Sequence, residues 1–491
     1  MNWFKNTVPR PLLWLLAAIA VVCVCWAIFT PPWQSPDETQ HFGYVQSVAE
    51  RFALPGDRQR LRYSSEHRLA DTLSKTGQEA RLPGAEWSRQ MYNSWKAKNA
   101  ALPPDARYNG GGRNSAAANP PLYYLYESVA YQAAAGGDIF NRLDVMRLWS
   151  SLFALATAIG TWLLAGEVFG RRRSLQLAAA AVVGLQPMVV FISSTVNPDG
   201  LLIALWTFAL WLGARILKRG LTMLDAVGLF GVVGLGIVTK ATTYALVPAA
   251  LFVLAVGAWR LRAAAGRRVA LISAVGLLAL AVPVGGWLAT ARALHRPAVN
   301  QVTSSEASGS RKQSKTGFNL RGFVSYVRQY YIPKLPGLKR TVYPATWPAY
   351  TVWFKGSWGV FGWRQYRLGA RVFFAIGVAA ACVLVALAFA FWRRRFPFDG
   401  AVLGFFALAV LGLLAVLHVT EYQVVFVNHS RADFTQGRYL LPVVSLLGIS
   451  VAGALTALSR RWRSYAVAGL LGGLLLLQLI ALETTARWFY A

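Results

Sequence analysis

Asp37, Glu38 and His41 place two adjacent carboxylates and an imidazole directly after the first apolar segment of the chain. A helix would present all three side chains on one face, because residues three and four positions apart are neighbours there. An aspartate in this place could accept a proton from a hydroxyl group as a catalytic base. A structural interpretation is also open, in which Ser35 is the N-cap, Pro36 the first helical residue and Glu38 closes a capping box, and the two can hold together.

Three further charged residues lie where apolar runs reach the same side of the membrane. Asp199 follows Asn197-Pro198 in a short turn between two apolar runs. If the next helix begins here, an acidic residue in its first turn also suits the helix dipole. Lys240 lies between two apolar runs and could simply extend to the membrane interface. Arg438 opens a later run, and its planar guanidinium suits phosphate oxygens. These cations could therefore bind a phosphate group.

The composition is that of a polytopic membrane protein. Of 491 residues, 55% are hydrophobic and 14% charged, and the mean hydropathy is +0.40. The net charge of +30 points to membrane topology and anionic head groups, and no nucleotide-binding or zinc-finger motif supports a nucleic-acid partner. His418 and His429 flank Glu421, but this spacing matches no standard ligand pattern. A divalent metal is therefore possible but not indicated, and no cofactor is predicted with certainty.

Eleven apolar runs are long enough to cross a membrane. They lie near 11–30, 146–166, 174–195, 200–217, 221–239, 241–259, 269–290, 372–392, 399–418, 438–458 and 465–485. Basic clusters occur at Lys5/Arg10, Arg171–Arg173, Lys218-Arg219, Arg260–Arg268, Arg393–Arg395 and Arg460–Arg463. Counting spans puts every cluster on one side, which the positive-inside rule makes cytoplasmic. We therefore expect an all-α bundle with its N-terminus in the cytoplasm, and the run at 221–239 is the weakest span.

Five regions follow from this topology: a first span (1–30), a large outer loop (31–145), spans two to seven (146–290), a basic outer loop (291–371) and spans eight to eleven (372–491). In the first loop, Phe42, Val45, Val48 and Phe52 recur at helical spacing and predict an amphipathic helix along the membrane surface. The second loop holds 14 Lys and Arg against one acid. It could rest on anionic lipid or bind phosphate, with segment 303–316 as a candidate lid.

Several short motifs carry a resemblance to a known family, and they occur in order along most of the chain. They are Ser35-Pro36-Asp37-Glu38-x-x-His41-Phe42, Asn119-Pro120-Pro121-Leu122-Tyr123-Tyr124, Asn197-Pro198-Asp199, Thr239-Lys240 and Gln436-Gly437-Arg438-Tyr439. The set resembles a large family of bacterial multi-pass membrane proteins of unknown function. That family is itself similar to the GT-C superfamily of glycosyltransferases, which use polyprenyl-phosphate-linked sugars.

The resemblance implies a GT-C-like transmembrane bundle with periplasmic juxtamembrane helices in a bacterial inner membrane. It implies Asp37 as the catalytic base, with Glu38 assisting, and it assigns the lipid phosphate to Lys240 and Arg438. The further substrate-binding residues that it implies are His41, Asp199, Tyr123 and Tyr439. The partners would be a polyprenyl-phosphate-sugar donor, membrane lipids and a glycan, glycolipid or cell-wall acceptor. The expected activity is an inverting transfer on the periplasmic side.

Two alternatives remain open from the sequence. A polymerase or ligase of lipid-linked glycans would depend on the arginines of 291–371 rather than on Asp37. A lipid or glycolipid transporter would belong to a different class. Ionisable residues are scarce in the middle of the spans, where a coupling pathway should need them, and the two halves show no repeat.

Overall fold

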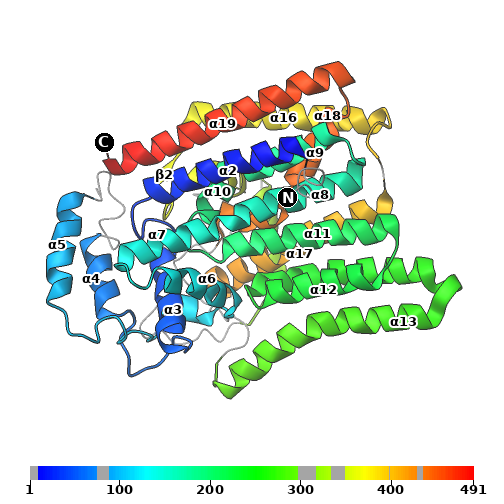
Figure 1. Ribbon diagram of the computed structural model, residues 1–491. Helices are drawn as coiled ribbons and strands as arrows, with labels where there is room; N and C mark the ends of the chain where they lie inside the picture. Colours follow the sequence, from blue (N-terminus) through cyan, green and yellow to red (C-terminus); the bar gives the residue numbers. More distant parts are fainter. Residues whose placement is uncertain are drawn as a thin grey trace.

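The computed structural model describes residues 9–74, 88–296, 317–332, 349–397, 399–427 and 435–490. Over these residues the chain is mainly helical, and the only strands that they contain form one short hairpin. The long helices run roughly side by side as a bundle, with a group of shorter helices at one end (Figure 1). This confirms the expected all-α polytopic architecture.

Among the described residues, nine helical segments are long and apolar enough to span a membrane, and a bent pair makes a tenth. They are α2 (Arg10–Phe29), α7 (Ile139–Ser150) with α8 (Leu152–Phe169), α11 (Asp199–Arg219), α13 (Val247–Ala293), which holds two spans, α16 (Ala370–Trp392), α17 (Gly400–Tyr422), α18 (Val444–Leu455) and α19 (Arg460–Tyr490). The bent pair is α9 (Arg173–Gly184) and α10 (Pro187–Ser193). The weakest run becomes α12 (Met223–Ile237), which at 15 residues is short for a span. Each of the eleven predicted runs thus has a helical counterpart.

A break at Gln186-Pro187 bends the α9–α10 pair by 61°. Proline lacks the amide hydrogen that would continue the helical ladder. The Gln186 side chain accepts a hydrogen bond from the Val189 amide at 2.8 Å and so caps the second helix. This bend turns α10 toward the loop end of the bundle.

The basic clusters lie at the other end of the bundle. Arg171–Arg173 joins α8 to α9, Arg393–Arg395 follows α16, and Arg460–Arg463 opens α19. In Figure 1 these connections lie at the right, whereas α3–α6 and the C-terminus lie at the left. The shared end agrees with the topology that was counted from the sequence.

The first loop folds into α3 (Glu38–Arg51), α4 (Ser65–Leu73), α5 (Arg89–Ala100), η2 (Ser115–Ala118) and α6 (Leu122–Ala133). The helix expected over residues 42–52 is confirmed as α3, and its apolar stripe, which was predicted to lie along the membrane surface, mostly faces the protein interior. Phe42, Val45 and Val48 are buried against the aromatic face of α6, and only Phe52 is exposed. The apolar stripe therefore packs inside the protein because α6 supplies tyrosines at the facing positions.

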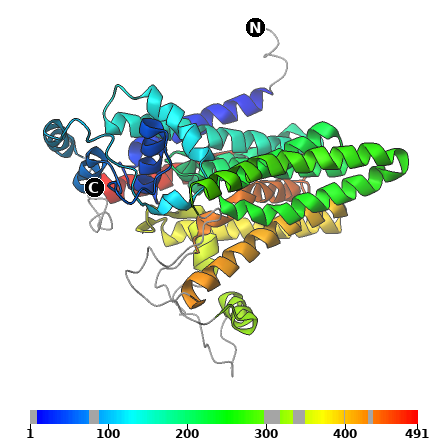
Figure 2. The ribbon, with the colours of Figure 1, turned by 90° about the horizontal axis from the view of Figure 1, so that it is seen from below.

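The second loop contains α14 (Leu320–Tyr331), η4 (Tyr350–Lys355), α15 (Gly356–Gly359) and the strands β1 (Val360–Phe361) and β2 (Tyr366–Arg367). Val360 pairs with Arg367 in an antiparallel register. Helix α14 lies beside the end of α17 in Figure 2, where His418 contacts the hydroxyls of Tyr326 and Tyr331 at 2.9 and 2.7 Å. The candidate lid at 303–316 falls outside the described residues.

Candidate functional site

Asp37 immediately precedes α3 and has a left-handed backbone, with φ 61°. The predicted capping box is wrong: the helix begins at Glu38, and the Ser35 hydroxyl has no hydrogen-bond partner among the described residues. A left-handed conformation is unusual outside glycine and persists where neighbouring contacts impose it. Here, Asn197 Nδ2 donates to the Pro36 carbonyl at 3.1 Å, and Glu38 is anchored on the other side.

Glu38 is fully buried and forms an ion pair with Arg147 of α7. The guanidinium donates to both carboxylate oxygens, through Nε at 2.8 Å and Nη2 at 2.6 Å. The same carboxylate accepts from the Trp33 and Val196 amides, both at 3.2 Å. All four contacts are with the protein itself, so Glu38 ties the start of α3 to α7 and to the turn before α11.

Arg147 also donates to three backbone carbonyls at the end of α2 and just after it. The acceptors are Ala27 at 3.0 Å, Thr30 at 2.6 Å and Pro31 at 3.0 Å. Arg147 is not among the site residues predicted from the sequence, although an arginine at the start of a predicted apolar run was a usable signal. Glu38 and Arg147 together fix the path of the chain on both sides of Asp37.

Asp37, Arg438, Asp199 and Lys240 meet although they are far apart in the sequence. Arg438 Nη2 lies 2.7 Å from Asp37 Oδ2, and its Nε lies 3.7 Å from Asp199 Oδ2. Lys240 Nζ lies 2.5 Å from Asp199 Oδ1. The Asp37 side chain is 37% exposed, against 5% for Asp199 and 6% for Arg438. Asp37 is thus the carboxylate of this cluster that an external hydroxyl can approach.

The local structure around Asp199 and Lys240 explains their placement. Asn197 Oδ1 accepts from the Asp199 amide at 2.9 Å, and α11 begins at Asp199. Burial would lower the pKa of Lys240, but the Asp199 carboxylate raises this pKa above its usual value, so the ammonium stays charged. The Tyr439 ring lies 5.1 Å from Lys240 Nζ and 5.3 Å from Arg438 Cζ, within cation–π range. The structure therefore brings Tyr439 into the cluster.

His41 lies one turn along α3 and contacts Tyr124, with 2.9 Å between Nδ1 and the hydroxyl. Burial lowers the pKa of His41 to about 4, so its imidazole is neutral at neutral pH. Asn119 Nδ2 donates to the same tyrosine hydroxyl at 3.0 Å. The hydroxyl can therefore donate its own proton to His41 Nδ1, which fixes the ring beside the charged cluster.

The Tyr123 side chain points away from His41, unlike that of the adjacent Tyr124. It is fully buried, and its hydroxyl lies 2.9 Å from Ser150 Oγ, which donates to Glu127 Oε1 at 2.6 Å. Burial raises the pKa of Glu127 to about 8. The structure thus places Tyr123 in a buried polar group between α6 and α7, and it is Tyr124 that reaches the site through His41.

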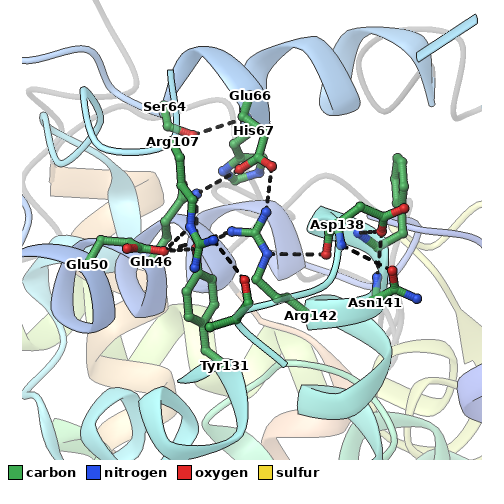
Figure 3. Close-up of polar contacts among 12 residues, drawn as sticks. Gln46, Glu50, Ser64, Glu66, His67, Arg107, Tyr131, Asp138, Asn141 and Arg142 are labelled. Atoms are coloured by element: carbon green, nitrogen blue, oxygen red, sulfur yellow. Dashed lines mark hydrogen bonds and ion pairs between the residues drawn. The ribbon is translucent and has the colours of Figure 1, made fainter. Parts of the chain in front are cut away.

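A second polar network holds the far half of α3 (Figure 3). Arg142 Nη2 lies 2.5 Å from Glu66 Oε1, and the Tyr131 hydroxyl donates to Glu50 Oε1 at 2.7 Å. Arg107 pairs with the same Glu50 carboxylate. These contacts connect α3 to α4, α6 and α7. Helix α3 is therefore fixed at both ends, which makes it a rigid mount for Asp37.

A cavity of about 180 Å³ adjoins the charged cluster, between α10, the segment 351–367 and the residues before η6 (Gly437–Val443). Its described lining holds four cations and no carboxylate. The cations are Lys355, Arg364, Arg367 and Arg438. Arg438 also lines a smaller cavity of about 50 Å³ with Asp199, Lys240 and Tyr439. The charge of this loop was evident from the sequence, but Lys355 and Arg367 are not among the predicted site residues.

A metal site at His418 and Glu421 finds no support in this geometry. His418 lies between two tyrosine hydroxyls, and Glu421 Oε2 accepts from the amide and hydroxyl of Thr435 at 2.7 and 2.8 Å. No group of three or more potential metal ligands occurs in the part of the chain that the structure describes. His429 lies outside that part.

Comparison with solved structures finds similar helical membrane proteins at low sequence identity. ArnT from Cupriavidus metallidurans in the apo state is 16% identical with a TM-score of 0.45, over 93% of this chain and 62% of that one. The same protein bound to undecaprenyl phosphate is 15% identical with a TM-score of 0.45, over 97% of this chain and 74% of that one. A third similar structure is the archaeal oligosaccharyltransferase AglB from Archaeoglobus fulgidus, in complex with an inhibitory peptide and a dolichol-phosphate. It is 14% identical with a TM-score of 0.46, over 98% of this chain and 55% of that one.

This chain therefore covers less than two thirds of the apo ArnT and AglB chains. No curated protein sequence matches it significantly. The family described as "Predicted membrane protein (DUF2142)" matches residues 20–447, which include every residue of the charged cluster. The chain belongs to this DUF2142 family of membrane proteins.

Proposed function

We propose that this protein is an integral-membrane inverting glycosyltransferase. It transfers a sugar from a polyprenyl-phosphate-linked donor to a glycan, glycolipid or cell-wall acceptor. The observation that carries the proposal is the contact between Asp37, a partly exposed carboxylate, and Arg438, a buried guanidinium beside a cationic cavity. A proton acceptor and a cation for an anionic leaving group thus lie next to each other.

The transfer is a single displacement at the anomeric carbon. Asp37 takes the proton of the acceptor hydroxyl while the hydroxyl oxygen forms the new bond to that carbon. The bond from this carbon to the phosphate oxygen breaks, and its electron pair leaves with the lipid phosphate. Arg438 stabilises the negative charge that develops there. Attack opposite the leaving group inverts the anomeric configuration.

The neighbouring residues position Asp37 and Arg438. Asp199, which is itself paired with Lys240, lies 3.7 Å from Arg438 Nε and helps to orient the guanidinium. His41 is neutral and orients the substrate beside Asp37. Glu38 acts as a positioning residue through Arg147 rather than on the substrate, because its four contacts are internal. Tyr439 shields the two cations.

The site lies at the end of the bundle opposite to the basic clusters. The protein then lies in the inner membrane of the cell, with its basic end and its N-terminus in the cytoplasm and the site facing the periplasm. A lipid-linked donor would then reach the cavity from the outer leaflet.

The test is sugar transfer from a lipid extract by the purified protein and by Asp37→Asn, which is nearly isosteric. Asp57→Asn is a matched control, since Asp57 is in the same loop and its side chain is similarly exposed, at 42%. We expect Asp37→Asn to melt like the wild type and to lose at least about 100-fold in rate, the usual contribution of a general base. Full activity of a folded Asp37→Asn would remove Asp37 as the base, and Asp57→Asn should stay active.

One observation favours a second candidate function. Lys355, Arg364 and Arg367 come from the basic loop and line the same cavity as Arg438. A polymerase or ligase of lipid-linked glycans would use these cations at the same place. Product size separates the two functions, because a polymerase yields a ladder of lengths from one donor and a transferase adds one sugar.

A further inference from the structure

The four charged residues at the centre of the proposed site neutralise one another. Asp37 pairs with Arg438 at 2.7 Å, and Asp199 pairs with Lys240 at 2.5 Å. Two carboxylates thus face two cations. Because Lys240 is paired with Asp199, these four residues together carry no net positive charge that would attract a phosphate group. The attraction for an anion must come from other residues of the cavity.

Lys355 and Arg367 supply that excess charge. Both line the cavity with Arg438, and neither forms an ion pair with a carboxylate of the described residues. Lys355 Nζ lies over the rings of Tyr350 and Phe373, at 5.3 and 5.7 Å from their centroids. Aromatic rings hold an ammonium in place without neutralising its charge.

The backbone places Lys355 next to Arg438. Gly356 and Gly437 pack directly against each other, and a Cβ on Gly437 would lie 2.3 Å from the Gly356 carbonyl carbon. Lys355 and Arg438 therefore flank one junction of two backbones. The β1–β2 hairpin holds Arg367 on the same wall through its pairing with Val360.

Arg438 has hydrogen-bonding capacity beyond its contact with Asp37, although its Nε also lies 3.7 Å from Asp199 Oδ2. It is 6% exposed, and its Nε and Nη1 have no hydrogen-bond acceptor among the described residues. A buried guanidinium with unused donors is costly unless a ligand supplies acceptors. The cavity is therefore lined by one buried cation whose hydrogen-bonding capacity is not fully used and by two cations that pair with no carboxylate of the described residues.

We propose that this cavity binds two adjacent phosphate groups, so that the donor sugar is linked to its lipid through a diphosphate. Arg438 binds the phosphate that carries the sugar, and Lys355 with Arg367 binds the phosphate attached to the lipid. This inference rests on the proposed function and narrows its donor. The breaking bond is then the one between the anomeric carbon and the diphosphate oxygen, the electron pair leaves with the diphosphate, and the hydroxyl proton goes to Asp37.

Binding of two probes by the full chain in detergent tests the proposal. The probes are farnesyl phosphate and farnesyl diphosphate, which differ by one phosphate group. We expect the wild type to bind the diphosphate about tenfold tighter or more. Lys355→Gln/Arg367→Gln should lose this preference and bind farnesyl phosphate as the wild type does. Arg371→Gln, which changes an exposed cation in the first turn of α16 outside the cavity lining, should keep the preference.

Equal affinity of the wild type for the two probes would overturn the inference, as would a preference that survives the double variant. Arg367→Gln alone provides a variant with an intact fold, because this side chain is exposed at the end of β2. If farnesyl phosphate still binds and Asp37→Asn still blocks transfer, the proposed function stands without the diphosphate. If neither probe binds the wild type, both proposals fail.

Discussion

The anchor between Glu38 and Arg147 gives the sharpest prediction on how the site is built. Glu38→Gln keeps the size of the side chain but converts one acceptor oxygen into an amide donor that faces Arg147. The guanidinium is then left buried without its counter-ion, with both side chains at most 1% exposed. Breaking a buried pair in this way costs ~3–5 kcal/mol of the free energy of unfolding.

The partner variant and the double variant separate an anchor from a catalytic group. Arg147→Met leaves a buried carboxylate and three backbone carbonyls without a donor, so it should destabilise at least as much as Glu38→Gln. The double variant Glu38→Gln/Arg147→Met leaves no unpaired buried charge. We therefore expect it to lose less stability than the sum of the single variants, with a coupling of ~0.5–3 kcal/mol.

The assay is denaturant or thermal unfolding in detergent, with transfer activity measured on the folded fraction. Glu483→Gln is the control, because it breaks an exposed pair with Arg487 and should change stability by no more than about 1 kcal/mol. The reasoning would be refuted by a Glu38→Gln variant that unfolds like the wild type yet has lost its kcat. That result would make Glu38 a group that acts on the substrate.

Two further predictions concern backbone packing and pH. Gly437→Ala should abolish activity and lower the melting temperature, because its Cβ would lie 2.3 Å from the backbone of Gly356. Gly469→Ala, whose Cβ would meet no atom within 4 Å, should leave the melting temperature unchanged. Burial raises the pKa of Glu127 from 4.5 to about 8. The folded state therefore favours the protonated carboxyl group, and its contribution to stability, complete below pH 4.5, should decline as pH rises through about 8. Unfolding followed from pH 4 to 9 should show this decline weakened in Glu127→Gln, and an unchanged slope would contradict the assignment.

The helices of the bundle could be predicted from the sequence because membrane spans depend on local hydropathy. The weakness of the 221–239 run was visible there in the same way, whereas the break at Gln186-Pro187 inside the predicted run 174–195 was not predicted. The capping box predicted at Ser35 is absent, because distant residues fix the chain around Asp37: Asn197 binds the Pro36 carbonyl and Arg147 binds the Glu38 carboxylate. Both of these residues lie more than a hundred positions away.

The sequence by itself determined the membrane class, the basic end of the bundle and the motifs that contain Asp37, Asp199, Lys240 and Arg438. Only the tertiary structure decided which of these residues touch. It joined Asp37 to Arg438 across 401 positions and placed cations of the basic loop on the wall of the same cavity. It also turned Glu38 inward to Arg147 and left Asp37 exposed. The physical reason is that spans follow from the burial of each segment in lipid, whereas the pairing of charges depends on how separate helices pack.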